Sequence, residues 1–404
     1  MKRKILFLEQ QSWLSGAQRV LQSVLDATAE EYDPIVAFPN DGPFRRKLED
    51  LKVQTLTYPL GLYQTGQKPL SEILQFARRS MLCAFKLARI IRSQDIGLVY
   101  INGPRCLPAG VLAARITGRP TLFHLHLTLV RKPEILLVAN LARYVSAVVS
   151  CSRAAAAGIV NANHRLTGKI HILYNPIASG DHLTHDPAQL QGSACDPSSL
   201  TLGVVGRITK PKGQRVLLNA LGRLDPTLKA KIRVIFIGAA SPDSNDDVTY
   251  NEHLEECATQ FNLREKVQWA GYQPTVAPFY RAMDVLVHPS LSNSGESMPL
   301  AVLEALQHGV PVVASWTGGI PEIVRHGWNG LLVPPGNEIA LATTLERFLQ
   351  DAALRARLRS GAKSSLDERF SPENFKSKIQ GLIWKLCRTQ QLHVPEAIRE
   401  EPAA

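Results

Sequence analysis

Short apolar runs alternate with longer segments of helical periodicity through most of the chain. The run Lys4–Leu8 is typical of a buried strand, and Ala17–Ala29 carries Val20, Val24 and Leu25 at helical spacing. Because strands alternate with helices of this length, the pattern predicts βαβ units and a parallel sheet. In the first half we expect further strands at Pro34–Phe38, Val53–Tyr58, Gly97–Ile101, Thr121–His126, Ser146–Cys151 and Ile170–Leu173, and helices at Pro43–Leu51, Leu70–Ser93 and Val111–Thr117.

The stretch Asn175–Ser199 is rich in Asp, Ser, Gly and Pro and has no periodic apolar pattern. The alternation then resumes, which predicts a second α/β domain. We expect domains at residues 1–178 and 199–371, a linker at 179–198, a C-terminal helix at 372–388 and a flexible tail at 389–404. The elements expected in the second half are strands at Leu202–Val205, Arg233–Ile237, Val267–Trp269, Val285–His288 and Val310–Ala314, and helices at Ala340–Leu349, Leu354–Ser360 and Pro372–Leu386.

The composition is that of an ordinary globular protein, with 404 residues, 45% hydrophobic and 20% charged. Six cysteines are scattered without a C-x-x-C pair, so we expect no metal site, and isolated thiols fit a reducing compartment. The first apolar run is too short for a signal peptide, and the longest one, Ile135–Val149, is interrupted by Asn140 and Arg143. We expect a soluble, cytoplasmic protein.

The net charge of +11 is concentrated in the first half of the chain. Residues 1–180 contain 23 of the 46 Lys and Arg but only 11 of the 35 Asp and Glu. Part of this excess lies on the amphipathic segment Gln75–Arg92, which has two interpretations: a core-facing helix with a solvated basic face, or attraction to an anionic membrane surface. Binding of nucleic acid is not expected, because no aromatic stacking platform accompanies the charge.

The most informative segment, Val287–Gly336, combines a strand end, a Ser/Asn/Gly loop and a helix start. The helix is expected to begin near Met298, with Ser297 as N-cap and Pro299 in the first turn. Its N-terminus then lies at the carboxyl end of a parallel strand, where ligands bind in open α/β sheets and exposed N–H groups suit a phosphate. The residues predicted to bind this phosphate are Met298, Pro299 and Leu300.

Two glutamates mark this helix: Glu296 precedes it and Glu304 lies within it. Eight residues of helix rise about 12 Å, which is too far for a general acid and base acting on one bond. The pair could instead hold two parts of an extended ligand, such as a sugar and a ribose on either side of a diphosphate. Taken alone, the pair can also be a solvated helix with an acidic first turn.

With its surroundings, the segment resembles the E-x7-E signature of family-four, group 1 glycosyltransferases, which are retaining enzymes of GT-B fold. The resemblance implies that Glu296 is catalytic and contacts sugar hydroxyls beside the reacting carbon, and that Glu304 binds the nucleotide ribose. Relatives often have Gly and Phe after the first Glu, where this chain has Ser297-Met298-Pro299. The other matching positions are His288-Pro289-Ser290, Gly309, Pro311 to Ala314, Gly318-Gly319, Pro321-Glu322 and Gly330 to Val333.

A second match is Gly206–Gly213 (GRITKPKG), which follows a predicted strand. It resembles the family's G-R-x4-K-G element and implies that Arg207 and Lys212 bind the donor diphosphate. Two fixed cations can stabilise a departing nucleoside diphosphate without a metal ion. Because no D-x-D sequence is present, we expect metal-independent chemistry with no cofactor beyond the nucleotide-sugar substrate.

Weaker matches occur in three other places. The loop after the first strand resembles the family's donor and acceptor loop, which implies a diphosphate contact at Gly16, where a side chain would block close approach. His126 stands at the end of a strand, where the resemblance implies a catalytic His near the donor sugar, with His124 as second choice. Gly271 and Tyr272 match the family position that contacts the nucleotide base.

The resemblance implies an α/β protein of GT-B fold, with two Rossmann-like parallel-sheet domains facing across a cleft. The first would bind the acceptor and the second the nucleotide-sugar donor, with the C-terminal helix crossing back. The implied activity is transfer of a hexose from a UDP- or GDP-type donor to a glycan or glycolipid, in cell-surface polysaccharide or glycolipid synthesis at the inner face of the membrane. Two alternatives remain open: a sugar-nucleotide epimerase of the same fold, and a non-catalytic membrane-associated protein that binds sugar nucleotides.

Overall fold

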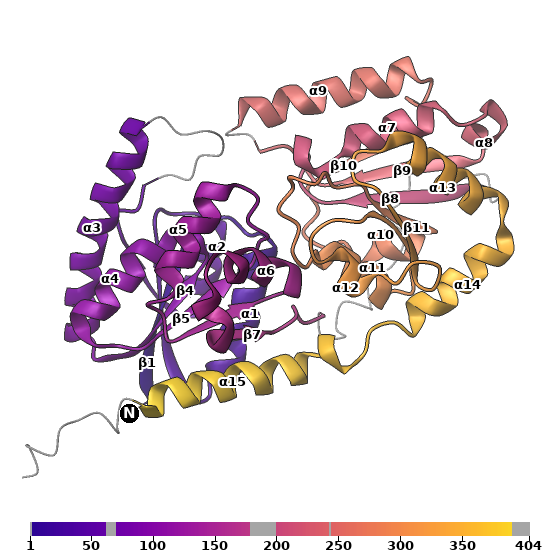
Figure 1. Ribbon diagram of the computed structural model, residues 1–404. Coiled ribbons are helices and arrows are strands. Elements are labelled where there is room, and N and C mark those ends of the chain that lie inside the picture. Colours follow the sequence, from indigo (N-terminus) through magenta and orange to yellow (C-terminus); the bar gives the residue numbers. More distant parts are fainter. Residues whose placement is uncertain (1, 62–69, 178–198, 242–243, 390–404) are drawn as a thin grey trace, which may run out of the picture. The chain divides into compact units, whose positions relative to one another are not determined.

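The computed structural model describes residues 2–61, 70–177, 199–241 and 244–389. The chain forms two compact units (Figure 1): unit 1 contains residues 1–174 and 373–404, and unit 2 contains residues 175–372. The predicted linker at 179–198 lies outside the described residues, as does the predicted tail from residue 390 onward. The chain therefore leaves unit 1 after Tyr174 and returns to it at Glu373.

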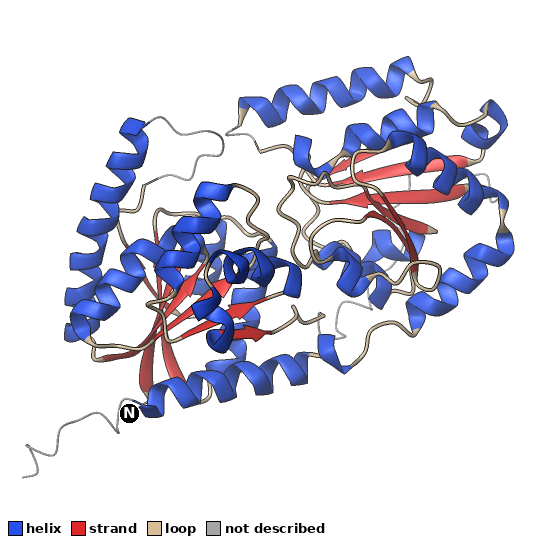
Figure 2. Ribbon diagram, in the orientation of Figure 1, coloured by secondary structure: helices blue, strands red, loops and turns tan. Residues whose placement is uncertain are grey.

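Unit 1 is built on a parallel sheet with the strand order β3-β2-β1-β4-β5-β6-β7 among its described residues, which is the order of a doubly wound Rossmann fold. Helices cover both faces of this sheet (Figure 2). The strands are β1 (Arg3–Glu9), β2 (Tyr32–Phe38), β3 (Gln54–Thr57), β4 (Ile96–Asn102), β5 (Thr121–Leu125), β6 (Ala147–Ser150) and β7 (Ile170–Ile172). The helices are α1 (Gly16–Thr28), α2 (Pro43–Asp50), α3 (Leu70–Ser93), α4 (Leu107–Thr117), α5 (Lys132–Ala142), α6 (Arg153–Ala162) and α15 (Pro372–Thr389).

The central strands of this sheet are continuous apolar runs because both of their faces are covered. In β1, every residue from Ile5 to Leu8 is fully buried, and β4 is equally buried from Leu98 to Ile101. Buried polar side chains follow at the carboxyl ends, with Glu9 on β1 and Asn102 on β4. That edge is where open α/β sheets bind their ligands, so the apolar pattern of the strands also locates a candidate site.

Unit 2 repeats this architecture with a parallel sheet of strand order β10-β9-β8-β11-β12-β13 within the part of the chain that the structure describes. Its strands are β8 (Leu200–Val205), β9 (Ile232–Ile237), β10 (Val267–Gly271), β11 (Val285–His288), β12 (Val312–Ser315) and β13 (Gly330–Val333). Its helices are α7 (Gln214–Gly222), α8 (Pro226–Ala230), α9 (Asn245–Gln260), α10 (Ala277–Ala282), α11 (Leu300–Gln307), α12 (Ile320–Ile323), α13 (Glu338–Gln350) and α14 (Ala352–Lys363).

The strands and helices expected from the apolar pattern are present, which confirms the predicted α/β class with parallel sheets. Several elements were given no residue range from the sequence, among them the helices α5 and α6 and the strand β13. Helix α5 occupies part of an apolar stretch in which the pattern showed no helical face, and β13 is a short strand that was noted only as a family match. The start of α4 is also earlier than predicted, at Leu107 rather than Val111.

The amphipathic prediction for α3 was wrong about which residues face the core. Under the core-facing interpretation of Gln75–Arg92, large apolar side chains such as Leu82 and Phe85 should be buried, but they are 55% and 56% exposed. The small side chains Cys83 and Ala84, with Leu87, are buried instead. Because α3 packs closely against α4, small residues fit that contact and the larger apolar side chains are left on the outer face.

Helix α15 belongs to unit 1, although it follows unit 2 in the sequence. Gln380 Nε2 donates to the carbonyl of Ala27 at 2.7 Å, and Arg3 Nη1 donates to the carbonyl of Cys387 at 2.8 Å. Its buried residues, among them Ile379 and Ile383, recur at helical spacing. Among the described residues, no helix is both long enough and apolar enough to span a membrane.

Candidate functional site

Glu296 lies in the loop between β11 and α11 and is only 7% exposed. Its Oε1 atom is 2.5 Å from Lys212 Nζ, 2.9 Å from Ser290 Oγ and 3.1 Å from His288 Nε2. Lys212 comes from the loop after β8, whereas His288 and Ser290 come from the end of β11. The carboxyl ends of two neighbouring strands thus place an ammonium, a hydroxyl and an imidazole around one carboxylate.

This environment keeps Glu296 ionised. Burial by itself raises the pKa of a carboxyl, but the charges and hydrogen bonds of Lys212 and His288 outweigh it and hold the pKa of Glu296 well below its usual range. A group that stays ionised at neutral pH does not serve as a general acid. Glu296 is therefore suited to accept hydrogen bonds from hydroxyl groups and to stabilise positive charge that develops nearby.

The backbone of Glu296 is fixed by the glycine loop that precedes α12. Gly318 has a φ of +53°, and a Cβ atom built on it would lie 1.7 Å from the carbonyl oxygen of Glu296. A residue without a side chain is therefore needed for this approach. Gly318 of the sequence motif therefore helps to position the loop that carries Glu296.

The loop Gly206–Gly213 carries the two residues predicted to bind a diphosphate: Lys212 lies beside the end of β11, and the backbone of Arg207 lies beside the end of β9. Gly213 has a φ of +73°, and a Cβ on it would lie 2.1 Å from the carbonyl oxygen of Pro289. This close approach brings Lys212 to Glu296. The side chain of Arg207 is exposed and forms no ion pair within the described residues, so its guanidinium can pair with an anion.

Glu304 lies within α11, where Tyr280 from α10 holds its side chain. Tyr280 Oη donates to Glu304 Oε2 at 2.8 Å, and the Tyr280 ring stacks on His308 with the ring centroids 5.3 Å apart. His308 Nδ1 in turn lies 2.8 Å from the carbonyl oxygen of Glu304. The carboxylate thus has a defined orientation.

Helix α11 begins at Leu300, so the predicted start near Met298 with a Ser297 cap is wrong. Pro299 is the N-cap residue with an extended ψ of 118°, and its side chain makes no capping hydrogen bond. A proline disfavours helical geometry in the residue before it, which excludes Met298 from the helix. Pro299 also has no N–H to offer a phosphate, whereas Met298 and Leu300 do. The side chain of Asn175 supports this loop by donating to the Met298 carbonyl at 2.9 Å.

Gly271 and Tyr272, the predicted base contacts, stand at the carboxyl end of β10. Gly271 has a φ of +65°, and its carbonyl accepts a hydrogen bond from Gly238 N at 2.8 Å. The Tyr272 side chain is 61% exposed, so its ring is accessible to a planar ligand. They occupy the same edge of the sheet as Lys212 and Glu296, because all the strands of unit 2 run parallel.

In unit 1, His126 follows β5 and joins a chain of buried polar groups. Its Nε2 lies 2.6 Å from Asn102 Oδ1, and Asn102 Nδ2 donates to Glu9 Oε2 at 2.5 Å. His124 is fully buried, and its Nδ1 lies 2.5 Å from the Tyr100 hydroxyl. Its ring contacts the tilted ring of His126 with the centroids 3.8 Å apart, and His126 is the less buried of the two. Burial lowers the pKa of His126 to about 3, so the ring is neutral and is not a proton donor at neutral pH.

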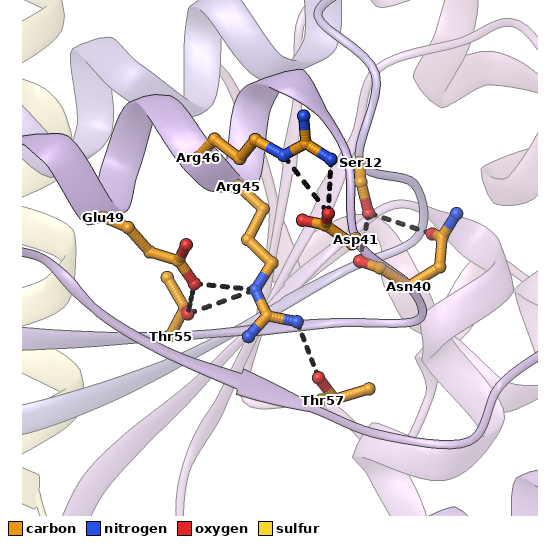
Figure 3. A network of polar contacts seen from close by, with 8 residues as sticks. All are labelled: Ser12, Asn40, Asp41, Arg45, Arg46, Glu49, Thr55 and Thr57. Carbon is orange, nitrogen blue, oxygen red and sulfur yellow. Dashed lines mark hydrogen bonds and ion pairs between the residues drawn. The ribbon is translucent and has the colours of Figure 1, made fainter.

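The loop after β1, which leads to Gly16 at the start of α1, is anchored to the loop after β2 (Figure 3). Ser12 Oγ donates to the carbonyl of Asn40 at 2.7 Å and lies 2.9 Å from its Oδ1. The same network ties α2 to β3, since Arg45 Nη1 donates to Thr57 Oγ1 at 2.7 Å. Gly16 itself is exposed, so its backbone is accessible to a ligand.

Each half of the chain matches a model of a known protein family. Residues 14–179 match the model described as Glycosyltransferase Family 4, and residues 188–365 match Glycosyl transferases group 1. The chain belongs to glycosyltransferase family 4. The two matches leave the residues around 180–187 and the two ends of this family 4 chain uncovered.

Individual relatives of the family 4 chain agree with this assignment. It is 34% identical over 171 residues to D-inositol 3-phosphate glycosyltransferase of Stackebrandtia nassauensis, which is 41% of this chain and 37% of the relative. It is 29% identical over 205 residues to the lipopolysaccharide core biosynthesis glycosyltransferase LpsE of Rhizobium meliloti, which is 51% of this chain and 55% of LpsE. The matches thus span about two fifths to one half of these relatives' lengths.

Solved structures match over nearly the whole chain. The crystal structure of Anabaena HepE in complex with UDP is 25% identical, with a TM-score of 0.77, and the match covers 95% of this chain and all of HepE. HepE has also been solved with UDP and glucose, with a TM-score of 0.76. The family 4 chain therefore has the GT-B fold, as predicted.

Several residues of the site were missed or given no role from the sequence. His288 and Ser290 stood within the matched motif but were not assigned to Glu296, and no pattern connected Tyr280 with Glu304. The sequence did contain a signal for Glu9 and Asn102, since each is a polar residue directly after an apolar run and ends a strand. Within the described ranges, no group of three or more His, Cys, Asp and Glu side chains is arranged to hold a metal ion.

We expect Gly318→Ala to destabilise the family 4 chain by about 2–4 kcal/mol, because the new Cβ clashes with the Glu296 backbone and the residue must keep a left-handed φ. Gly327→Ala is the matched control. Its φ is +79° but no atom lies within 4 Å of the added Cβ, so only the conformational cost of about 1–2 kcal/mol applies. Urea unfolding measures the free energy of unfolding of both variants. Equal losses of stability in Gly318→Ala and Gly327→Ala would contradict the packing account.

A second prediction concerns pH. Burial raises the pKa of Glu9 from 4.5 to about 7, so between these values the unfolded chain loses a proton that the folded chain keeps. The contribution of Glu9 to the free energy of unfolding should therefore fall by about 3 kcal/mol as the pH rises through this window. The contributions of His124 and His126 to the free energy of unfolding rise with pH instead, because burial lowers the pKa values of both side chains. The test is therefore the difference between wild type and Glu9→Gln in urea unfolding from pH 4.5 to 8, and a pH-independent difference would contradict it.

Proposed function

We propose that this chain transfers a hexose, with retention of configuration, from a nucleoside-diphosphate sugar to a hydroxyl acceptor in the assembly of a cell-surface polysaccharide or glycolipid. The observation that supports this most is the contact of Lys212 with Glu296 at the carboxyl ends of β8 and β11. It places a cation suited to a diphosphate next to an ionised acceptor suited to sugar hydroxyls.

In the proposed reaction, Arg207 and Lys212 bind the donor diphosphate together with Gly16 and the N–H groups of Met298 and Leu300. The bond between the sugar carbon C1 and the phosphate oxygen breaks, and the acceptor oxygen bonds to C1 from the same face. The acceptor proton passes to the departing phosphate oxygen. The two cations stabilise the negative charge on the leaving group, so the proposal requires no metal ion.

The remaining residues bind the rest of the donor. Glu296 accepts hydrogen bonds from sugar hydroxyls, and His126 contacts the sugar as a neutral imidazole. Glu304 binds the ribose hydroxyls in the orientation that Tyr280 gives it, and Tyr272 with Gly271 contacts the base. UDP is the favoured nucleotide, because HepE, the 25% identical relative, was solved with UDP and with UDP and glucose.

The two alternatives are less well supported. A sugar-nucleotide epimerase would use a similar donor site, but the relatives named above are glycosyltransferases. A non-catalytic binding protein would not require the ionised Glu296 beside the diphosphate-binding Lys212. Release of UDP with transfer of the sugar, as opposed to its isomerisation, separates the transferase from the epimerase.

UDP at a hundred times its dissociation constant, in EDTA, should stabilise the wild-type protein by about 2.7 kcal/mol in thermal unfolding, and GDP and ADP should stabilise it less. Glu304→Ala should abolish most of this gain, because the ribose contact is lost. The matched control is Glu346→Ala, an exposed position on α13, which should keep the full shift. A shift that requires Mg²⁺ or Mn²⁺, or that survives in Glu304→Ala, would contradict the donor-site proposal.

We further propose that the outer face of α3 attaches the protein to an anionic membrane that carries the acceptor. Its exposed residues include large apolar side chains, 52–62% exposed, together with basic ones. Such a face suits a lipid interface better than water. The apolar residues are Ile73, Leu74, Met81, Leu82 and Phe85, and the basic residues are Arg78, Arg79, Lys86, Arg89 and Arg92.

Sedimentation with phosphatidylglycerol vesicles tests this attachment. Leu82→Gln combined with Phe85→Gln should weaken binding about tenfold or more, since the apolar area available for insertion is lost. Ile339→Gln, which replaces a 62% exposed apolar residue on α13, should bind as the wild type does. Equal binding to neutral phosphatidylcholine vesicles, or no effect of the double substitution, would contradict the proposal.

A further inference from the structure

A fully buried carboxylate, Glu9, lies at the carboxyl end of β1, and the donor-binding roles above leave it unused. Its Oε1 atom accepts hydrogen bonds from the backbone N–H of Gln10 (2.7 Å) and Gln11 (3.2 Å) and from Gln18 Nε2 (2.9 Å). Its Oε2 atom accepts from Asn102 Nδ2 at 2.5 Å. The carboxylate thus ties the loop after β1 and the first turns of α1 to the end of β4.

These contacts determine the orientation of the Asn102 amide. An ionised carboxylate can only accept hydrogen bonds, so the NH2 group of Asn102 must face Glu9. The other amide atom, Oδ1, then faces His126 Nε2 at 2.6 Å. Because an amide oxygen is also only an acceptor, Nε2 must carry the hydrogen of the neutral imidazole.

The second ring nitrogen of His126 is left as an acceptor by this arrangement. Nδ1 is buried and has no hydrogen-bond partner within the described residues. A buried polar atom without a partner costs about 1–3 kcal/mol, so it gains from a ligand that can donate to it. An imidazole whose Nδ1 carries no hydrogen can accept a hydrogen bond from a hydroxyl group. It cannot accept one from a phosphate oxygen, which has no hydrogen to donate.

We propose that Glu9 is a positioning residue for His126: through the Asn102 amide it holds the imidazole in the tautomer whose Nδ1 accepts a hydrogen bond from a hydroxyl of the donor sugar. The identity of that hydroxyl donor rests on the proposed function. The orientation of the ring rests only on the contacts of Glu9, Asn102 and His126.

A neutral side chain at position 9 would lack this effect. Glutamine has almost the same shape, but its amide can present either a donor or an acceptor to Asn102. The Asn102 amide could then turn over, and His126 could carry its hydrogen on either nitrogen. The negative charge of Glu9 therefore selects one of two arrangements that the packing alone would allow.

Nitrogen NMR of ¹⁵N-histidine-labelled protein tests the positioning at pH 8, where Glu9 is ionised. The His126 signals are identified by their loss in His126→Gln. We expect hydrogen on Nε2 in the wild type, and a mixture of tautomers in Glu9→Gln and in Asn102→Leu. The matched control Glu31→Gln, which removes an exposed carboxylate before β2, should retain the wild-type signals. Hydrogen on Nδ1 in the wild type, or unchanged signals in both network variants, would overturn the proposal.

Release of UDP from UDP-glucose gives a second, kinetic readout. Glu9→Gln and Asn102→Leu should each lower kcat about tenfold with little change in KM, the size expected for one misplaced hydrogen bond in the transition state. The double variant should be no slower than either single variant, because both act through His126. Additive losses would mean separate structural roles and would overturn the proposal. If the wild type releases no UDP, the donor assignment fails, while the nitrogen spectra still decide the role of Glu9.

Discussion

The ion pair between Lys212 and Glu296 is the contact on which the proposed donor site of unit 2 depends. It joins two loops that are far apart in sequence, and each loop needs a glycine for the approach, Gly213 on one side and Gly318 on the other. The pair also determines the chemistry. Lys212 keeps the buried Glu296 ionised, and Glu296 holds the ammonium of Lys212 at the edge of the sheet, where a diphosphate would bind.

The two units stabilise a buried carboxylate in different ways. Each has a buried glutamate at the carboxyl end of its sheet, Glu296 in unit 2 and Glu9 in unit 1. A cation beside Glu296 lowers its pKa, whereas Glu9 receives only neutral hydrogen bonds and burial raises its pKa to about 7. The first arrangement suits direct contact with a charged substrate. The burial of Glu9 among neutral partners destabilises the fold, but its hydrogen bonds fix the orientation of the neighbouring neutral groups. This agrees with the role inferred for Glu9.

Local sequence patterns predicted the fold and pointed to the residues of the proposed donor site, because the signals for both lie in short stretches of the chain. Buried parallel strands are short apolar runs, and the motif around Glu296 and the Gly206–Gly213 loop place their residues at the ends of such strands. The start of α11 was mispredicted because Ser297 looked like a cap, while the conformational demand of Pro299 decided the boundary. Contacts between distant elements, such as Tyr280 with Glu304 or Glu9 with Asn102, depend on how helices and strands pack, which no local pattern contains.

The most direct test of the account is the preference of the donor site for a diphosphate over a monophosphate. Isothermal titration would compare UDP with UMP in Glu296→Gln and in Glu296→Gln combined with Lys212→Met, since removing Lys212 alone would leave a buried carboxylate unpaired. If Lys212 binds the diphosphate, the first variant prefers UDP and the second loses most of that preference while UMP affinity stays the same. An unchanged preference for UDP in the absence of Lys212 would contradict the account.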